Sequence, residues 1–426
     1  MRLMKRLKHS RVSNIPVFLL ILALVAGALA GCGGPKNTGS PDSTQTGGEP
    51  AASDNASAKP DDASADSGEQ PAGSEAPVKP EIKNAQNFDI EYLENNVKLV
   101  TDSDGRKLLL VPKEGEVPTG YEDAVLVRTP VSHAMYTSTT HIGYLDSLEE
   151  ESLYDTIAAV TTQEADWTLP QVKERFANGQ ITYVAQDHWN AGDIEEIIQV
   201  DPEIVFSGGG DESGVKLRAL LDESKIGYAV VTDWTEKDNA AILEWIKFFG
   251  AFFNLDEKAD RIYEEKLARM EELYNKTADI PEKDRPVVAY CLIYDGIVYT
   301  QAGNSAFARE MEKAGGVYAL KDLEGEGSVQ IGMEEFFDKC KDADVLIYGS
   351  LPQYLADKAA LLETEPLFSE CKAFQNDRVY IFDQGYYMNS ARVAEKFEDV
   401  VAMFHPDLLP GHQFTMYQKL PDAPKK

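Results

Sequence analysis

The chain has 426 residues, with 72 acidic side chains against 41 basic ones and a formal net charge of −31. This negative charge repels phosphate backbones, so we expect no nucleic-acid partner. Of the 4 cysteines, Cys32 lies near the N-terminus, and Cys291, Cys340 and Cys371 are scattered at no metal-like spacing. A cysteine-rich scaffold is therefore excluded, while one disulfide among the last three stays open.

The first 31 residues have the order of a secretory signal peptide: basic residues up to Arg11, an apolar run from Ile15 to about Leu29, then small residues. The run is shorter than the ~20 residues of a membrane-spanning helix. Leu29-Ala30-Gly31-Cys32 resembles the bacterial lipobox, in which the cysteine becomes the first mature residue and carries a diacylglyceryl group. The resemblance implies that Cys32 is lipidated; the alternative is a plain signal peptide followed by an accidental cysteine.

Residues 32–80 are rich in Gly, Ser, Asp, Ala and Pro and contain almost no aliphatic or aromatic side chains. Such a segment cannot bury enough apolar surface to offset the entropy of ordering. We expect a disordered tether between the lipidated cysteine and the body.

The body is expected to begin with a first lobe over residues 81–237. Phe88–Tyr92, Val97–Thr101 and Leu108–Val111 are strand-like, with a turn at Asp102–Gly105, which predicts a β-hairpin lead-in. From about residue 125, strands and helices alternate, which predicts a parallel sheet covered on both faces. The expected strands are 125–128, 157–160, 182–185, 204–206 and 228–231.

Residues 238–280 are expected to be helical. Asn239–Phe253 is apolar on most sides. A longer helix follows, with Asp256 as its N-cap and an apolar face that includes Ile262 and Met270 at helical spacing. At roughly twenty residues, or about 30 Å, it is as long as a domain is wide.

Residues 281–426 return to alternation and predict a second α/β lobe. The expected strands are 287–292, 297–300, 345–348 and 379–382, and the expected helices are 306–314, 333–339 and 394–404. The predicted fold is therefore α/β, with two Rossmann-like lobes joined by a single long α-helix and an N-terminal β-hairpin extension.

This organisation behind a lipobox resembles the substrate-binding lipoproteins of bacterial ABC importers, in the subclass that serves iron–siderophore complexes, haem and cobalamin. Glu244–Gly250, Gly303–Ser305 and Phe404–Pro410 resemble its iron-complex branch. The resemblance implies no catalysis and no intrinsic cofactor, a cleft between the lobes, and delivery of an iron-containing ligand to a permease and its ATPase. It implies a location at the outer face of the cytoplasmic membrane.

In open parallel sheets, ligands bind beyond the carboxyl ends of the strands. The loops expected there supply the candidate ligand residues, which are His133, Met135, Tyr136, Trp167, His188, Trp189, Asn190, Trp234, Asn304, Tyr386, Tyr387 and Arg392. The two histidines could ligate a metal or hydrogen-bond a ligand, or else face solvent. The tyrosines could ligate haem iron or stack on a ligand, or else pack within a lobe. Arg392 could pair with a ligand carboxylate or form a surface salt bridge.

The family docks on its permease through one acidic side chain on each lobe. The usual glutamate is missing from Thr140–Asp146, so Asp146 or Glu149 is the substitute on the first lobe, and Glu310 or Glu312 is the candidate on the second. Ordinary solvated acids are the alternative for all four.

Three other classes were weighed against a substrate-binding protein. An enzyme lacks support because the chain has no nucleophile elbow, His-Glu-x-x-His motif or P-loop. A zinc or manganese binder needs several converging histidines and carboxylates, and the body holds only His133, His141, His188, His405 and His412. A surface adhesin would be expected to show repeats. The first choice of ligand is a ferric siderophore, with haem or a corrinoid as the alternative.

Overall fold

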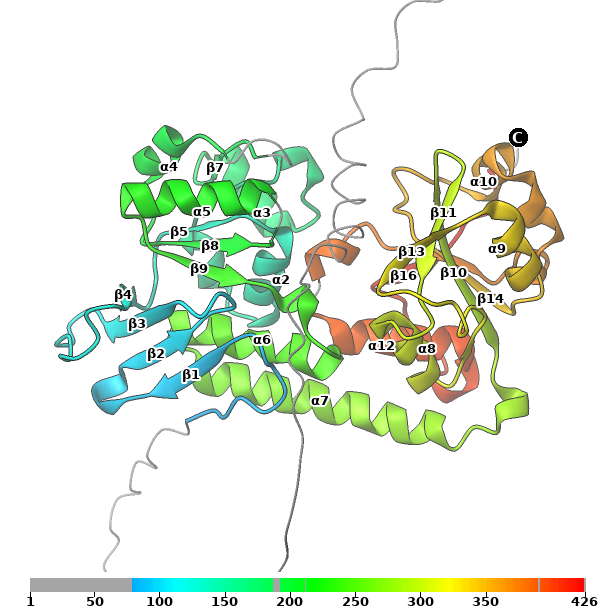
Figure 1. Ribbon diagram of the computed structural model, residues 1–426, viewed down its shortest axis with the longest axis horizontal. Coiled ribbons are helices and arrows are strands. Elements are labelled where there is room, and N and C mark those ends of the chain that lie inside the picture. The colour runs from blue at the N-terminus through cyan, green and yellow to red at the C-terminus, as the bar shows by residue number, and fades with distance from the viewer. Residues whose placement is uncertain (1–78, 187–191, 211, 390, 425–426) are drawn as a thin grey trace, which may run out of the picture. The chain divides into compact units, whose positions relative to one another are not determined.

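The computed structural model describes residues 79–186, 192–210, 212–389 and 391–424 (Figure 1). The predicted signal peptide, Cys32 and nearly all of the predicted tether lie outside the described residues, as do His188, Trp189 and Asn190. Within the described ranges, no helix is both long enough and apolar enough to cross a membrane.

The N-terminal extension is a four-stranded sheet, larger than the hairpin that the sequence predicts. Its strands run in the order β1 (Asp89–Tyr92), β2 (Lys98–Thr101), β3 (Lys107–Pro112) and β4 (Val125–Thr129). The β2–β3 hairpin is as expected, but β4 pairs with β3 in parallel and does not join the first-lobe sheet. That assignment of residues 125–128 was wrong, because a short apolar strand carries no signal for the sheet that it joins.

The first-lobe sheet has five parallel strands in the order β7-β6-β5-β8-β9. The strands are β5 (Ala134–Tyr136), β6 (Ile157–Val160), β7 (Thr182–Tyr183), β8 (Ile204–Gly208) and β9 (Tyr228–Val231). The helices are α2 (Thr139–Ser147), α3 (Pro170–Ala177), α4 (Ile194–Val200) and α5 (Glu212–Ser224). The central strand β5 therefore begins at Ala134, so the residues that follow it up to Tyr136 belong to a strand and not to a loop.

The second-lobe sheet is mixed, with the main order β13-β11-β10-β14-β15-β16 and β12 paired to β10. Strands β12, β10, β14 and β15 are parallel, and β11, β13 and β16 run antiparallel to their neighbours. The strands are β10 (Val287–Tyr294), β11 (Ile297–Gln301), β12 (Val317–Tyr318), β13 (Ser328–Ile331), β14 (Val345–Tyr348), β15 (Val379–Phe382) and β16 (Tyr417–Lys419). The helices are α8 (Ala306–Lys313), α9 (Met333–Cys340), α10 (Lys358–Thr364), α11 (Lys372–Gln375) and α12 (Val393–Phe404).

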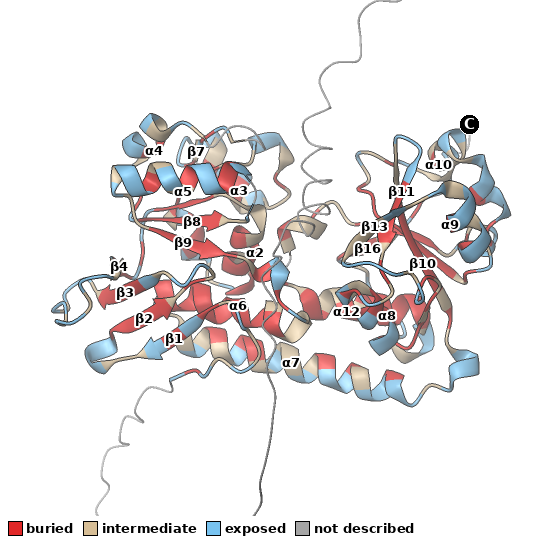
Figure 2. Ribbon diagram, in the orientation of Figure 1, coloured by how far each residue is buried: buried red, intermediate tan, exposed pale blue. Residues whose placement is uncertain are grey.

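Two helices lie between the lobe sheets in the chain: α6 (Asn239–Phe252) and the unbroken, 23-residue α7 (Asp256–Ala278). Helix α6 is buried along most of its length (Figure 2). Leu255, not Asp256, is the N-cap of α7; the Asp256 carboxylate instead accepts from Lys98 Nζ at 2.6 Å.

The lobes are joined by a pair of helices, and not by α7 alone. In α7, Ile262 and Met270 belong to the first-lobe core and Leu273 to the second. Helix α12 is divided in the same way, with Val393 in the first core and Phe397 in the second. The pair is held by the ion pairs Lys266–Glu395 and Arg269–Glu398, the second at 2.6 Å.

Gly143 lies where backbone of the second lobe approaches α2. A Cβ on residue 143 would lie 2.1 Å from the carbonyl oxygen of Met388, which is in the 3-10 helix η8 (Tyr386–Asn389). We therefore predict that Gly143→Ala lowers the midpoint of denaturant unfolding, although alanine favours a helix by about 1 kcal/mol over glycine. Gly332→Ala, at the N-cap of α9 where a Cβ meets nothing within 4 Å, is the control without a clash and should lower the midpoint only by the preference of the N-cap for glycine over alanine. An unchanged or raised midpoint for Gly143→Ala would contradict this packing.

Candidate functional site

The carboxyl ends of strands from both lobes converge at α2 and η8. Thr168, after β6, donates its hydroxyl to Met388 Sδ at 3.1 Å, and its backbone N–H lies 3.4 Å from the same sulfur. The segment after β15 therefore packs directly on the segment after β6. This is the geometry expected of loops that border one ligand site.

An ion pair crosses the same contact. Arg392, just before α12, donates to the Asp146 carboxylate of α2 at 2.9 Å. Tyr154 donates its hydroxyl to the other oxygen of that carboxylate. Asp146 is mostly buried, with 14% of its side chain exposed. Arg392 therefore has a carboxylate partner within the protein.

A second polar contact joins the loop after β9 to α8. The buried Glu310 carboxylate accepts from Asn239 Nδ2 at 3.2 Å and pairs with Lys396 Nζ at 2.9 Å. Arg309 donates to the carbonyls of Asn304 and Lys237. Because these groups belong to α6, α8, α12 and the adjoining loops, they join the two lobes, with Glu310 buried and Arg309 at the exposed rim of the contact.

Aromatic rings gather at the end of β15. Tyr386 stacks on Phe382 with ring centroids 3.9 Å apart, and Tyr387 meets Tyr386 edge-on at 5.3 Å. Burial raises the pKa of Tyr387 well above its usual value. Its phenol is neutral at physiological pH and can stack or form hydrogen bonds.

Polar side chains flank this aromatic group. Gln384 donates to Gln353 at 2.9 Å, which links the segments after β15 and β14. Asp166, in the 3-10 helix η4 (Glu164–Asp166), is close enough to influence Tyr354: burial, and then this carboxylate, raise the tyrosine's pKa.

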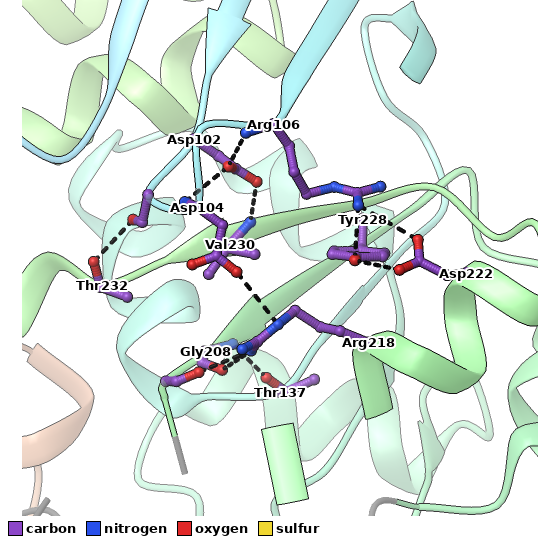
Figure 3. A network of polar contacts seen from close by, with 12 residues as sticks. Asp102, Asp104, Arg106, Thr137, Gly208, Arg218, Asp222, Tyr228, Val230 and Thr232 are labelled. Carbon is purple, nitrogen blue, oxygen red and sulfur yellow. Dashed lines mark hydrogen bonds and ion pairs between the residues drawn. The ribbon is translucent and has the colours of Figure 1, made fainter. Parts of the chain in front are cut away.

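The glycine loop after β8 is held by the N-terminal extension (Figure 3). Arg218 of α5 donates to the carbonyl of Gly209 at 2.8 Å and lies 3.6 Å from Asp104 of the β2–β3 turn. The Gly208 N–H donates to Thr137 Oγ1 at 2.8 Å. Asp102 of the same turn accepts from the Val230 N–H at 2.8 Å, so the turn also covers the edge of β9.

Several of the predicted ligand residues do not lie at the carboxyl edge of the sheet, where the prediction put them. His133 precedes β5, at the amino end of the sheet, and its Nε2 contacts the carbonyl of Val200 at 2.8 Å. Met135 and Tyr136 lie within β5 and are buried in the core. Because residues 125–128 were assigned to the lobe sheet, the following strand was taken for a loop. Trp167 is also buried, and its Nε1 donates to the Thr162 carbonyl, so it lies beneath the site.

Other candidates do lie at the expected edge. Trp234 follows β9 and is 44% exposed. Asn304 follows β11 and is exposed. Tyr386, Tyr387 and Arg392 lie at the convergence of the lobes, although Arg392 is paired with Asp146.

Two of the four docking candidates are engaged inside the protein. Asp146 pairs with Arg392, and Glu310 pairs with Lys396. Neither carboxylate is free to meet a permease arginine, and the sequence could not reveal this because each partner is distant in the chain. Glu149 and Glu312 are exposed and stay candidates.

Gly143, Thr168 and Met388 contribute to the convergence but were not predicted. Of these three residues, only Gly143 could have been predicted from the sequence, because a glycine among the buried residues of an amphipathic helix marks a close approach of another segment. Thr168 and Met388 contact each other across a sequence separation of 220 residues, which no local pattern encodes.

No grouping of His, Cys, Asp and Glu suitable for a metal occurs in the parts of the chain that the structure describes. One open hollow lies away from the convergence, and another lies beside η4. One, of about 690 Å³, is at the amino ends of β8 and β9, and the other, of about 720 Å³, is between η4 and α3. Cys291, Cys340 and Cys371 are all buried free thiols.

The Asp146–Arg392 pair is testable by a double-mutant cycle with Asp146→Asn and Arg392→Gln. We expect a coupling of about 1 kcal/mol in the free energy of unfolding, because the pair is partly buried and joins two lobes. The control is the cycle of Glu335 and Lys339, an i,i+4 pair on α9 with 47% and 44% of the side chains exposed, which should couple by about 0.3 kcal/mol. A smaller coupling for the first pair than for the control would refute the assignment.

His141 of α2 predicts a pH dependence of stability. Its ring is fully buried near Phe249, and desolvation lowers its pKa from 6.5 to about 3. Between these values the unfolded chain binds a proton that the native protein does not, so stability falls as the pH falls below 6.5. From about pH 7 to about pH 5.5, we expect a loss of about 1 kcal/mol through this residue.

The measurement is denaturant unfolding of the native protein and of His141→Gln at both pH values. The variant should lose less stability between the two than the native protein does. Equal losses would show that His141 can be protonated in the folded state.

A comparison of the chain with known proteins agrees with this architecture. The uncharacterized lipoprotein MJ0878 of Methanocaldococcus jannaschii is 25% identical over 363 residues, which cover 79% of this chain and 85% of that one. Among solved structures, the TroA-like periplasmic binding protein FepB of Veillonella parvula has a TM-score of 0.53 at 15% identity, covering 76% of this chain and 99% of that one. A periplasmic haem-binding protein of Pseudomonas aeruginosa has a TM-score of 0.50 at 16% identity, covering 69% and 99%.

The predicted two-lobe α/β fold is thus confirmed. The model of the periplasmic binding protein family matches residues 138–386, more than half of the chain and most of both lobes. The chain therefore belongs to the periplasmic binding protein family and is a binding protein rather than an enzyme.

Proposed function

We propose that the chain is the substrate-binding lipoprotein of an ABC importer, and that it captures an iron complex, in the first place a ferric siderophore, and delivers it to a membrane permease. Haem or a corrinoid held in the same way is the alternative. The observation that carries the proposal is the convergence at α2 and η8. There Met388, in the same 3-10 helix as Tyr386 and Tyr387, meets Thr168 of the other lobe, and a Cβ on Gly385 would lie 3.3 Å from the Thr168 hydroxyl.

These side chains suit a bulky organic complex. Phenol rings supply flat apolar area, and the amide and hydroxyl groups supply hydrogen bonds that fix its orientation. Of the two proteins of similar fold, one is named FepB and the other is named as a haem-binding protein. The second name is consistent with a metal-bearing organic ligand. The helix pair α7–α12 leaves the two lobes little freedom, so the ligand is expected to be held with small lobe movements.

Membrane anchoring is part of the proposal. Cys32 follows a lipobox-like sequence, and the relatives MJ0878 and MJ0872 are named as lipoproteins. Acyl chains on Cys32 would hold the protein at the outer face of the cytoplasmic membrane, within reach of the permease and its ATPase. Glu149 and Glu312 are the candidate docking acids, one on each lobe.

We expect ligand binding to change the tryptophan fluorescence of the protein, because Trp234 is exposed after β9 and Trp167 lies beside Thr168. The experiment titrates full-length protein in detergent with ferric siderophores, haemin and cobalamin. A saturable change with at least one of them is the expected result. Tyr387→Ala should raise the Kd for that complex at least about tenfold, because it removes an aromatic surface from the site.

Tyr121→Ala, in the N-terminal extension, is the matched control and should leave the Kd unchanged. The proposal fails if none of the complexes binds. If a complex binds but Tyr387→Ala and Tyr121→Ala behave alike, the site lies elsewhere.

A further inference from the structure

The turn between β2 and β3 fastens the N-terminal extension to the edge strand of the first-lobe sheet, β9. The buried Asp102 carboxylate accepts from the backbone N–H of Val230 in β9 at 2.8 Å. The Ser103 N–H donates to the carbonyl of the same valine at 3.4 Å, and Thr232 donates its hydroxyl to the Ser103 hydroxyl at 2.9 Å. None of these bonds uses the side chain of Asp104, so the extension is fixed on the lobe by the rest of the turn.

The side chain of Asp104 is instead linked to the glycine loop after β8, through Arg218 of α5 (Figure 3). Its carboxylate lies 3.6 Å from Arg218 Nε. Arg218 Nη1 donates to the carbonyl of Gly209 at 2.8 Å and lies 3.5 Å from the carbonyl of Gly208. Because a guanidinium group is planar and rigid, partners at two of its nitrogens fix its orientation. The Arg218 side chain is only 11% exposed, so this link is shielded from solvent.

The glycine loop is held from the opposite direction by the segment that leads into α2. The Gly208 N–H donates to Thr137 Oγ1 at 2.8 Å, and a Cβ on Gly208 would lie 3.7 Å from the ring of His141 in α2. Gly209 has a φ of +60°, a conformation that favours glycine. The loop thus lies between Arg218 and α2, the helix that packs on η8. Because it follows the carboxyl end of β8, it belongs to the edge at which ligands bind.

We propose that Arg218 is a positioning residue of the binding site, and that the N-terminal extension raises ligand affinity through Asp104 and Arg218. This inference rests on the proposed function. It adds to the site a part of the chain that precedes residues 138–386, the region that matches the family model. With the Arg218 bonds in place, the backbone of the glycine loop is held in one conformation before the ligand arrives. Without them, the loop is ordered only when the ligand binds, and that cost in entropy lowers the affinity.

The test measures ligand binding by the full-length protein in detergent. The probe is whichever of ferrichrome, ferric enterobactin, haemin and cyanocobalamin gives the strongest saturable change in tryptophan fluorescence. We expect Arg218→Gln to raise its Kd about tenfold, and Asp104→Asn to raise it about threefold because the acid is 50% exposed and acts only on the guanidinium. The double variant should bind no more weakly than Arg218→Gln alone, since Asp104 acts through Arg218.

Each variant has a matched control in the same part of the protein. Lys216, also on α5, pairs with Glu212 of its own helix at 2.6 Å and is 49% exposed, so Lys216→Gln removes a cation that does not touch the glycine loop. Asp89, on β1, is an exposed acid of the extension, so Asp89→Asn removes a charge away from the turn. Both controls should change the Kd by less than about twofold.

Hydrogen exchange of the ligand-free protein separates positioning of the loop from general support of the fold. In Asp104→Asn and Arg218→Gln, peptides that span Phe206–Gly210 should exchange at least about threefold faster than in the native protein, because the loop opens more often. Exchange in α7 and the midpoint of denaturant unfolding should stay unchanged in Asp104→Asn, whose turn keeps its bonds to β9. Faster exchange throughout the first lobe in this variant would overturn the inference, since Asp104 would then stabilise the fold as a whole.

The outcomes also distinguish the inference from the proposed function. If a probe binds and both variants keep the native Kd, the inference is wrong and the importer function stands. A double variant that binds clearly more weakly than Arg218→Gln would show that Asp104 does not act through Arg218, and would also overturn it. If none of the four probes binds to the native protein, the proposed function fails, and the inference fails with it.

Discussion

The close approach of η8 to α2 is the constraint on which the site depends. At Gly143 the space that a side chain would occupy holds the carbonyl of Met388, so the two backbones pack without a spacer. Because interiors are close-packed and respond to a change of even one methylene, this contact fixes the position of η8 on the first lobe. The loops after β6 and β15 are thereby brought together, and Tyr386 and Tyr387, which belong to the second of these loops, pack against the second-lobe core.

The helix pair α7–α12 stabilises that arrangement of the lobes. Each helix places part of its apolar face in each core, so neither lobe can turn without disturbing buried residues such as Met270 and Phe397. The ion pairs between the helices are partly shielded from solvent, with 19–36% of their side chains exposed, and they help to fix the register of the two helices. A stiff junction of this kind favours recognition by a preformed surface over recognition by closure.

Sequence patterns predicted those parts of the fold that depend on local periodicity. We could predict the long apolar face of α7, with Ile262 and Met270, and the alternation of strands and helices, because both depend only on residues that are close together in the chain. Placement of β4 failed because strand pairing is a long-range property. As a result, Met135 and Tyr136 of β5 were assigned to a loop, and His133 was assigned to the wrong end of the sheet. The pairing of Arg392 with Asp146 was equally invisible, since the two are 246 residues apart.

The start of the body is fastened to helix α6. The buried carboxylate of Glu244 on α6 accepts from the backbone N–H groups of Lys83, Asn84 and Ala85 at 2.6–2.9 Å. Glu236 likewise accepts from the backbone of Gln86 and from Trp245 Nε1 at 3.1 Å. A carboxylate that receives several N–H donors replaces its lost hydration, so burial is tolerated. The segment that enters the body is thus fastened to α6, and a pull along it is borne by these bonds rather than by η8 or the residues around Tyr387.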